Sequence, residues 1–510
     1  MDILHVLLLL PIIILLVLQH KNTTKRQSKT KRVIPGPPGL PLIGNLHQFF
    51  NSAPHQYLYQ LSKKYGPLIS FQLGSVPAVV VSSARMAEEV MRTHDLVFCS
   101  RPPMLGPLKL SYDGIDIALS PYNEKWRELR KLCVVHLLST KRVQSFRPIR
   151  EDEVFRMMGK ISRDAAEGKL TNLTETVMRF ASTIVCRVAF GKRYDEEDHE
   201  RKRFSNLFHE AQAAHVWFYF SDFFPKFGWL DRFTGTLPRL EKVFKELDTF
   251  YQELIDEHMD YSTRPESMDG DIIDLMLQLR QENPSSSLEI TVDHIKAMIK
   301  NVFFAGTDTS AGTIVWAMTA LMKNPATMQK VQAEIRTVIG NKQQKTIIID
   351  EDDVEKLPYL KAVVKETFRL YPPAPLLVPR YTMDNCIVDG FPISSNTIVY
   401  INAWAIARDP DYWENPDEFL PERFLDGRYK DIDMKGQDFH FIPFGAGRRG
   451  CPGYFMGLMT VELTLANLLY SFNWELPSGM KRQDIDTHQV LPGITMLKKE
   501  DLQLVASKYI

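Results

Sequence analysis

The sequence predicts a large, mainly α-helical domain with small β-sheets, an α+β architecture. The longest helical pattern runs from Thr291 to Lys323, with Thr291 or Asp293 as its N-cap. An alternating apolar pattern over residues 67–82, broken at a Gly-Ser-Val-Pro segment, predicts a β-hairpin, and residues 397–402 predict another short strand. Beyond residue 41 there is no second linker-like stretch and no internal repeat. We therefore expect residues 42–510 to form one domain.

Composition and charge exclude several classes of protein. The chain has 510 residues, of which 44% are hydrophobic, so it can bury a large core. It carries 62 basic and 62 acidic residues, and therefore no net charge that would attract nucleic acid. Its five cysteines are widely spaced, with no C-x-x-C pair. This count and spacing disfavour both a disulfide framework and a cysteine-rich zinc site.

Residues 1–20 differ in kind from the rest of the chain. The run from residue 3 to 18 is apolar apart from His5, and as a helix it would span about 24 Å of a hydrocarbon core of roughly 30 Å. Basic residues follow this run rather than precede it, at Lys21, Lys25, Arg26, Lys29, Lys31 and Arg32. This order predicts an uncleaved single-pass anchor with the catalytic body in the cytosol. A poorly formed signal peptide is the alternative.

Residues 21–41 read as a basic flank followed by a proline-rich hinge. The segment 35–41 contains four prolines and cannot form a helix, because proline lacks an N–H and restricts the residue before it. We expect it to run extended and to hold the catalytic body at a fixed angle to the anchor.

The strongest chemical signal is Cys451. It lies in a segment, residues 444–453, that contains four glycines and two arginines and precedes an apolar helical run. A helix N-terminus, nearby N–H donors and arginines favour a thiolate, and the glycines allow close approach of a flat ligand. A lone thiolate is a poor structural zinc site but suits axial ligation of haem iron.

Cys451 could also serve in a different class of protein. A cysteine phosphatase would place an arginine six residues further on, where this chain has Gly457. A cysteine hydrolase needs a histidine partner, and the thirteen histidines leave that possibility open. A merely buried cysteine fits poorly with so many glycines and arginines.

The middle of the long helix is unexpectedly polar, reading Ala-Gly-Thr-Asp-Thr-Ser over residues 305–310. Polar residues and a glycine inside a buried helix cost stability. A structural cause is available, because Thr and Ser hydroxyls can hydrogen-bond to the preceding turn. On this segment alone, a functional and a structural interpretation are equally open.

The pattern Phe444-x-x-Gly447-x-Arg449-x-Cys451-x-Gly453 resembles the haem-binding signature of the cytochrome P450 superfamily. Similarity extends from the proline hinge to the C-terminus and is greatest to plant microsomal A-type enzymes. The resemblance implies the cytochrome P450 fold and a haem b whose iron is bound by Cys451. Its implied cofactor-binding residues are Trp126, Arg130, Ala305, Arg380, Phe444, Gly447, Arg449, Cys451 and Gly453.

The same resemblance assigns roles in catalysis and folding. Asp308 and Thr309 would deliver protons for cleavage of the O–O bond, which favours monooxygenation over peroxide rearrangement. Glu366, Arg369 and Arg423 would form a structural ion triad. The Glu-x-x-Arg spacing means little alone, since ordinary helical pairs share it.

Substrate-facing segments are also implied by the resemblance. Their candidate side chains are Leu105, Leu108, Leu376, Leu377, Ile494 and Thr495. Most are apolar, which favours a lipophilic small molecule such as a phenylpropanoid, terpenoid, alkaloid or aldoxime. The aromatic stretch 217–229 reads either as a lid that dips into the bilayer or as core packing. Lys498 follows Leu497, where a histidine at the latter position is more usual in the family.

The expected partners follow from what the chain lacks. No flavin or dinucleotide fingerprint is visible, because the G-x-G-x-x-G spacing at residues 445–450 belongs to the cysteine loop, so electrons must come from outside, from NADPH through the membrane-bound flavoprotein reductase. Arg448 and Lys435 are candidate contacts for an acidic face of that reductase. The other partners are O2, the substrate and the endoplasmic reticulum membrane, with no nucleic acid. The alternatives are a reductase-independent haem-thiolate isomerase or dehydratase, and a non-enzymatic, membrane-tethered haem binder.

Overall fold

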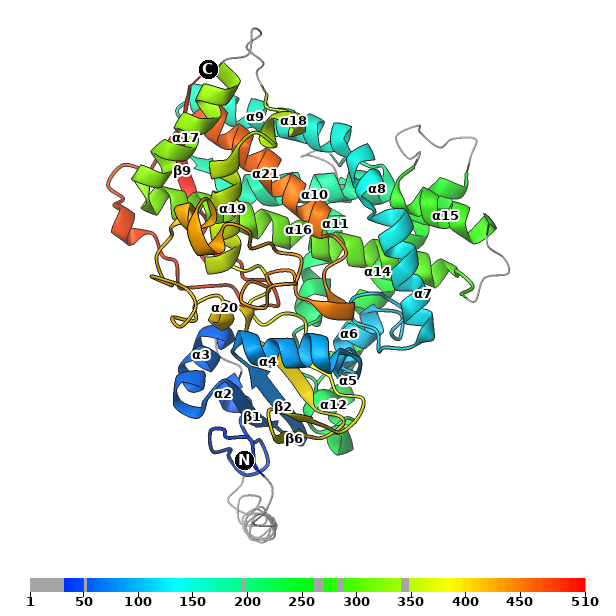
Figure 1. The fold of residues 1–510 in the computed structure, drawn as a ribbon. Helices are drawn as coiled ribbons and strands as arrows, with labels where there is room; N and C mark the ends of the chain where they lie inside the picture. Colours follow the sequence, from blue (N-terminus) through cyan, green and yellow to red (C-terminus); the bar gives the residue numbers. More distant parts are fainter. Residues whose placement is uncertain are drawn as a thin grey trace, which may run out of the picture.

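The computed structural model describes residues 32–49, 53–194, 199–260, 270–282, 288–340 and 348–509. Helices dominate, and the largest sheet lies at the end of the molecule where the described chain begins (Figure 1). The predicted α+β architecture is confirmed. The anchor expected at residues 1–20 lies outside the described residues.

The largest sheet has the strand order β1-β2-β7-β4. Its strands are β1 (Leu68–Leu73), β2 (Val76–Val81), β4 (Arg380–Tyr381) and β7 (Ile398–Ile401). The hairpin predicted over 67–82 is confirmed as β1 and β2, which pair antiparallel from Leu68↔Val81 to Leu73↔Val76. The strand predicted at 397–402 is confirmed as β7, which pairs parallel with β2.

Two smaller sheets complete the β-structure. One has the order β3-β9-β8 and the other pairs β5 with β6. Their strands are β3 (Thr171–Asn172), β8 (Phe472–Glu475), β9 (Gln503–Lys508), β5 (Cys386–Val388) and β6 (Phe391–Ile393).

Most of the longer helices form one large body above the β1-β2-β7-β4 sheet in Figure 1, with β9 among them. The longer ones are α3 (Pro54–Tyr65), α7 (Glu124–Leu132), α9 (Arg147–Ala166), α10 (Leu173–Phe190), α11 (His199–Ala214), α14 (Thr236–Met259), α15 (Ile272–Glu282), α16 (Val292–Lys323), α17 (Pro325–Gly340), α19 (Pro358–Leu370) and α21 (Tyr454–Ser471). The short ones are α2 (Leu46–Phe49), α4 (Ala84–Glu88), α5 (Asp95–Phe98), α6 (Leu105–Leu110), α8 (Thr140–Ser145), α12 (Phe220–Phe223), α13 (Leu230–Phe233), α18 (Glu351–Val354) and α20 (Ala403–Ile406).

Helix α16 crosses the centre of this body and packs against α10, α19 and α21. The predicted helix is confirmed, and of the two candidate caps Thr291 is the N-cap, because its hydroxyl accepts from the backbone of His294 in a capping box. Most of its 32 residues are buried. Ala305, near the middle, is nevertheless exposed. An exposed residue there means that the neighbouring elements leave open space beside the helix.

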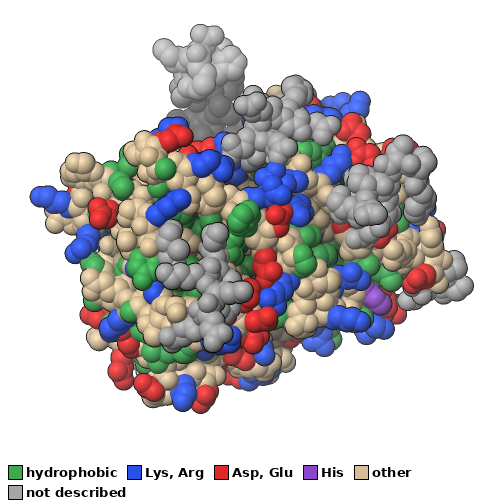
Figure 2. Space-filling model, turned by 90° about the horizontal axis from the view of Figure 1, so that it is seen from above, with side chains coloured by type: hydrophobic (Ala, Val, Ile, Leu, Met, Phe, Trp, Pro, Cys, Tyr) green, Lys and Arg blue, Asp and Glu red, His purple; other side chains and the backbone are tan. Residues whose placement is uncertain are grey.

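The surface carries basic and acidic side chains side by side, as Figure 2 shows for one face. This mixture agrees with the equal numbers of basic and acidic residues. Within the described part of the chain, no helix combines the length and apolarity needed to cross a bilayer.

Candidate functional site

The cysteine loop, residues 444–453, leads into the N-terminus of α21. A 3-10 turn at Gly447–Arg449 folds it, and the backbone N–H of Cys451 donates to the carbonyl of Phe444 at 2.9 Å. Gly447 has a φ of 68°, and a Cβ there would lie 2.5 Å from the carbonyl oxygen of Met91. Only glycine fits this position, because both the left-handed backbone and the close contact exclude a side chain.

Aromatic packing fixes the loop from its other side. The ring of Phe444 lies 5.0 Å from that of Phe368 on α19 and 5.0 Å from that of Tyr454 on α21. At Gly453 a Cβ would lie 4.0 Å from the Cys451 sulfur, so glycine here keeps the space beside the sulfur open. The signature residues Phe444, Gly447 and Gly453 thus shape the loop around Cys451.

Cys451 keeps exposed surface although its environment is desolvated. Burial raises the pKa of its thiol, while the N–H groups of Gly453 and Tyr454 and the charge of Arg130 act in the opposite direction. The donors expected from the sequence are present, but desolvation outweighs them because it penalises the charged form. A metal cation bound to the sulfur would reverse this balance and deprotonate the thiol outright.

Four guanidinium groups gather beside the cysteine loop. They belong to Arg101, Arg130, Arg380 and Arg449. Arg130 donates to the carbonyl of Gly450 at 2.5 Å, and Arg380 donates to that of Ala446 at 2.8 Å. Within the described residues, Arg380 is the one member of the four with a carboxylate partner, Asp95 at 3.1 Å. The cluster therefore carries more positive charge than its own carboxylates balance.

Burial and mutual repulsion act on this cluster. Burial and the nearby charges of Arg449 and Arg380 lower the pKa of Arg101 well below its usual range. Burial likewise lowers the pKa of Arg449 to about 10. Arg449 also lies 3.9 Å over the ring of Trp126, whose indole N–H donates to the carbonyl of Ile117 at 3.0 Å. Such a cluster suits an anionic ligand with two carboxylates. The resemblance did not single out Arg101, and its contacts to residues 118, 378 and 379 join segments distant in sequence.

The polar middle of α16 presents two faces. The hydroxyl of Thr309 donates to the carbonyl of Ala305 at 2.5 Å, and Thr307 makes the same kind of bond to Phe303 at 3.0 Å. Both hydroxyls therefore bond to the preceding turn of the helix, which is the structural interpretation of these threonines. Thr309 itself is half-buried beside exposed Ala305, so both border the open space along the helix.

Asp308 points toward α11 instead. Its Oδ2 accepts a hydrogen bond from Nε2 of Gln212 at 2.5 Å, whereas its Oδ1 is buried without a partner among the described residues. Burial raises the pKa of Asp308, and the Gln212 hydrogen bond and the charge of His209 oppose this shift. Gln212 had no signal in the sequence, because its partner lies 96 residues away.

A buried ion pair holds the loop after α6 against α16. Nζ of Lys300 donates to Asp116 at 3.0 Å and to Ser111 at 2.8 Å, and all three side chains are almost fully buried. Asp116 also accepts from the backbone of Leu119 and Ser120. The pair thus fixes the loop after α6 on α16. Sequence reasoning missed this contact.

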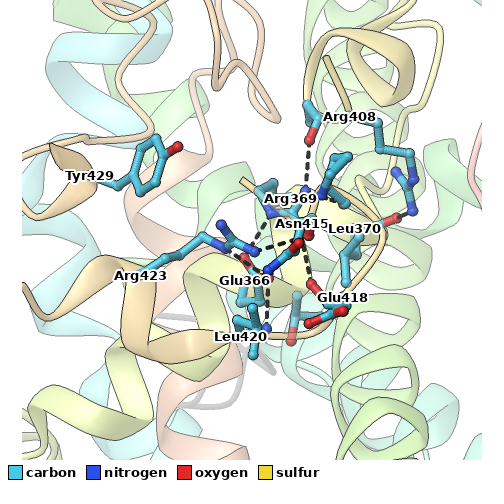
Figure 3. A network of polar contacts seen from close by, with 12 residues as sticks. Glu366, Arg369, Leu370, Arg408, Asn415, Glu418, Leu420, Arg423 and Tyr429 are labelled. Atoms are coloured by element: carbon cyan, nitrogen blue, oxygen red, sulfur yellow. Dashed lines mark hydrogen bonds and ion pairs between the residues drawn. The ribbon is translucent and has the colours of Figure 1, made fainter. Parts of the chain in front are cut away.

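The predicted ion triad is assembled at α19, the helix that contacts the cysteine loop through Phe368 (Figure 3). Glu366 accepts from Arg369 at 2.8 and 2.9 Å, from Arg423 at 3.1 Å and from the backbone N–H of Leu420 at 2.9 Å. The remaining guanidinium N–H groups donate to backbone carbonyls. These belong to Ala407, Glu414, Asn415, Pro416 and Glu418. The network therefore pins the long loop 407–423 to α19.

The substrate-facing candidates are dispersed. Leu105 packs against the helical core, Leu377 against the cluster that includes Ala446, and Leu376 against the core of the β1-β2-β7-β4 sheet. Leu108 and Thr495 are half-buried and Ile494 is 38% exposed. No single hydrophobic cluster of the described residues contains them all.

The aromatic stretch 217–229 contains both buried and exposed side chains. Tyr219 and Phe223 are buried, and the carbonyl of Phe223 accepts from the backbone and hydroxyl of Ser75 at 2.8 and 2.9 Å. Phe227 and Trp229 are 53% and 59% exposed. The two buried rings are thus core packing, whereas Phe218, which directly precedes Tyr219, and the two later rings are open on the surface.

Comparison with known proteins identifies the family to which this chain belongs. The cytochrome P450 family model matches residues 34–504. The chain belongs to the cytochrome P450 family. It is 51% identical to a 6,7,8-trihydroxycoumarin synthase of Pastinaca sativa, with 94% of this chain and 95% of that protein covered. It is 50% identical to a xanthotoxol synthase of the same plant, with 93% of each chain covered.

Two further matches agree. Cytochrome P450 71A1 of Persea americana is 46% identical, with 92% of each chain covered. A solved zebrafish cytochrome P450 with abiraterone superposes with a TM-score of 0.74 at 25% identity and covers 90% of this chain and 99% of that one. This cytochrome P450 is therefore a plant A-type enzyme with the predicted fold, as the sequence resemblance implied.

The residues around Cys451 fit haem b, the cofactor of this family. The exposed sulfur, the open space beside Ala305 and the unbalanced arginine cluster are what an iron porphyrin with two propionates requires. The protein is a monooxygenase of plant specialised metabolism that uses O2 and a redox partner reductase, with electrons from NADPH. The isomerase and the non-enzymatic alternatives are thereby set aside.

Proposed function

We propose that this cytochrome P450 oxygenates an aromatic substrate of the coumarin type and that the sequence-predicted residues carry the reaction. Cys451 would bind the haem iron, and Arg130, Arg380 and Arg449 would bind the propionates. This assignment is supported by the exposed Cys451 sulfur and by the arginine cluster with its shortage of carboxylates. When bound, haem with an axial thiolate supplies dioxygen activation and favours O–O cleavage.

The residues of α16 would manage protons. Thr309 lies at the open space, where its hydroxyl can exchange its bond to Ala305 for one to a bound ligand or water. Asp308, one residue away, has an unpartnered oxygen that suits a water molecule, which could carry a proton between the two side chains. The pair would thus hold and move protons without taking part in binding the cofactor.

The substrate class is supported by relatives named for coumarin products at 50–51% identity. The apolar candidates Leu105, Leu108, Leu376, Leu377, Ile494 and Thr495 would line its path or pocket. A flat, mostly apolar molecule with a few oxygen atoms fits such a lining, since few polar contacts are offered to orient it.

The endoplasmic reticulum membrane is the proposed location, with residues 1–20 as anchor, 21–41 as flank and hinge, and 42–510 as one catalytic domain. Two exposed apolar groups support a membrane-facing end. They are Leu40, Leu42 and Ile43 in the hinge region and Phe227, Trp229 and Phe233 near α12 and α13. Gly74 in the β1–β2 turn donates to Ile43 of the first group, and Ser75 in the same turn donates to Phe223 of α12, four residues before Phe227 of the second group. They therefore lie at one end of the molecule.

The proposed redox partner is the membrane-bound, NADPH-dependent cytochrome P450 reductase. Of the two candidate contacts, Lys435 is exposed, while Arg448 is bound to Asp95 at 2.9 Å and half of its side chain is accessible. We expect Lys435→Glu to raise the reductase concentration needed for half-maximal turnover, because an acidic partner would be repelled. Lys242→Glu, on the exposed face of α14, is the matched control. An unchanged reductase titration for Lys435→Glu would remove this contact from the proposal.

The test of the whole function uses full-length protein in microsomes with added reductase. We expect the reduced protein to bind carbon monoxide with the red-shifted Soret band of thiolate-ligated haem, and to convert coumarins to products one oxygen atom heavier in an NADPH- and O2-dependent reaction. Cys451→Ser should lose both properties, whereas Cys386→Ser, a half-buried cysteine on β5, should keep them. Retention of the band by Cys451→Ser would refute the ligand assignment, and turnover of other lipophilic molecules but no coumarin would refute the substrate class.

A further inference from the structure

His215 follows directly after the last residue of α11 and has its tautomer fixed by the backbone. Its Nδ1 lies 2.8 Å from the carbonyl oxygen of Ala211. A carbonyl oxygen can only accept, so Nδ1 carries the hydrogen of this bond. Burial, reinforced by the charge of Lys300, lowers the pKa of His215 to about 3. The ring is therefore neutral at physiological pH, and its Nε2 is a hydrogen-bond acceptor.

That acceptor has nothing to accept from within the described residues. Nε2 has no partner among them and, unlike Oδ1 of Asp308, it is not a sealed, buried atom. The nearby cation does not serve it, because Nζ of Lys300 is bound to Asp116 and Ser111. An accessible, neutral acceptor in a desolvated environment is well suited to bind a ligand hydroxyl.

The ring of His215 lies against the polar middle of α16. The imidazole packs against Phe304 with ring centroids 5.1 Å apart. Phe304 lies one helical turn from Asp308, on the face of α16 toward α11, and this face adjoins the one that carries the exposed Ala305. His215 and Gln212, three residues apart, thus both face the polar middle of α16. The apolar ring of Phe304 beside a single acceptor is a suitable surface for an aromatic molecule.

We propose that His215 is a substrate-binding residue whose Nε2 accepts a hydrogen bond from a phenolic hydroxyl, so that the enzyme prefers a phenol to its methyl ether. A methyl ether or a lactone carbonyl offers no donor and would leave Nε2 unpaired when the substrate displaces water. A cationic donor is disfavoured because the charge of Lys300 already acts on this ring. The inference rests on the proposed function in taking the substrate to be an oxygenated aromatic compound.

The test compares a hydroxycoumarin with its methyl ether in binding to purified holoenzyme, followed by the shift of the haem Soret band. We expect wild type to bind the phenol about three- to tenfold more tightly, the range that one net hydrogen bond provides. His215→Phe should abolish this preference, and His215→Gln, which keeps an acceptor, should retain part of it. Glu210→Gln, an exposed change on the same helix, should leave it intact.

Equal binding of the two ligands by wild type, or an unchanged preference in His215→Phe, would overturn the inference, as would failure of the hydroxycoumarin to bind. The carbon monoxide spectrum of each variant shows whether its haem site is folded, and His215→Gln provides a second variant. The outcome is separate from the proposed function, because oxygenation of coumarins can persist without a preference for phenols. Conversely, a preference without any product would refute the oxygenation and leave the binding role of His215 standing.

Discussion

Two regions of this cytochrome P450 treat their buried carboxylate and amide oxygens in opposite ways. At α19, both carboxylate oxygens of Glu366 are bound, and its two arginine partners donate onward to backbone carbonyls. On α16, single atoms of Asp308 and Asn301 are buried without partners among the described residues. The first region is organised as a closed network, and the second leaves acceptors open.

The difference has an energetic meaning. A buried polar atom without a hydrogen bond costs about 1–3 kcal/mol, so the region on α16 gives up stability that the triad region keeps. A buried acceptor of this kind can be satisfied by an internal water, whereas a closed network resists any change in position. The chain thus combines a rigid support for the cysteine loop with a polar region on α16 whose unmade hydrogen bonds water can form.

The sharpest way to break the closed network is Glu366→Ala. It would leave two buried guanidinium groups without their carboxylate, which costs about 3–5 kcal/mol in unfolding free energy. We expect the midpoint of urea unfolding, followed by circular dichroism, to fall accordingly, with loss of haem incorporation. Glu422→Gln, a change at a partly exposed ion pair with Lys330, should cost less than about 1 kcal/mol. Equal effects of the two variants would mean that the network is not a special source of stability.

Thr309→Ala tests the open region on α16, where we expect a loss of catalytic coupling rather than of stability. Its hydroxyl bonds back to its own helix in a half-buried position, so the unfolding midpoint should change little. The fraction of NADPH oxidation that yields product should instead fall by about tenfold or more, with hydrogen peroxide released, because a proton-delivering group is lost. Thr313→Ala removes a comparable backbone-bonded hydroxyl one turn further along and is the control. Intact coupling in Thr309→Ala would contradict the proposed role.

The two regions also differ in how far sequence predicts them. The loop glycines, the Thr291 cap and the Glu366-x-x-Arg369 spacing are local patterns whose structure follows from backbone geometry and helix periodicity. The contact of Gln212 with Asp308, and that of Lys300 with Asp116, join residues 96 and 184 positions apart. No local rule selects such partners, because they depend on how α11 and the loop after α6 pack on α16.

Cys451 shows a second limit of sequence reasoning. Its loop, the following helix and the neighbouring arginine are all readable from the sequence, yet the pKa of the thiol is raised. The reason is burial, which depends on the complete fold around the sulfur and opposes every local feature that favours the thiolate. The residues near Cys451 in the sequence identify it as the functional cysteine. Only the tertiary structure determines whether its thiol or its thiolate is favoured.

The smallest effect that we predict comes from Gln212→Leu, which removes one hydrogen bond from the open region. Because the Gln212 N–H favours the charged form of Asp308, its loss should raise the pKa of Asp308 beyond the increase already caused by burial, with the charge of His209 still acting downward. The pH profile of coupling should therefore move to higher pH, and coupling at a fixed pH should change by a few-fold. Glu210→Gln on the same helix is the control for helix α11. If Gln212 acts through Asp308, the leucine substitution should have no further effect in an Asp308→Asn background, and an additive loss there would show that it acts elsewhere.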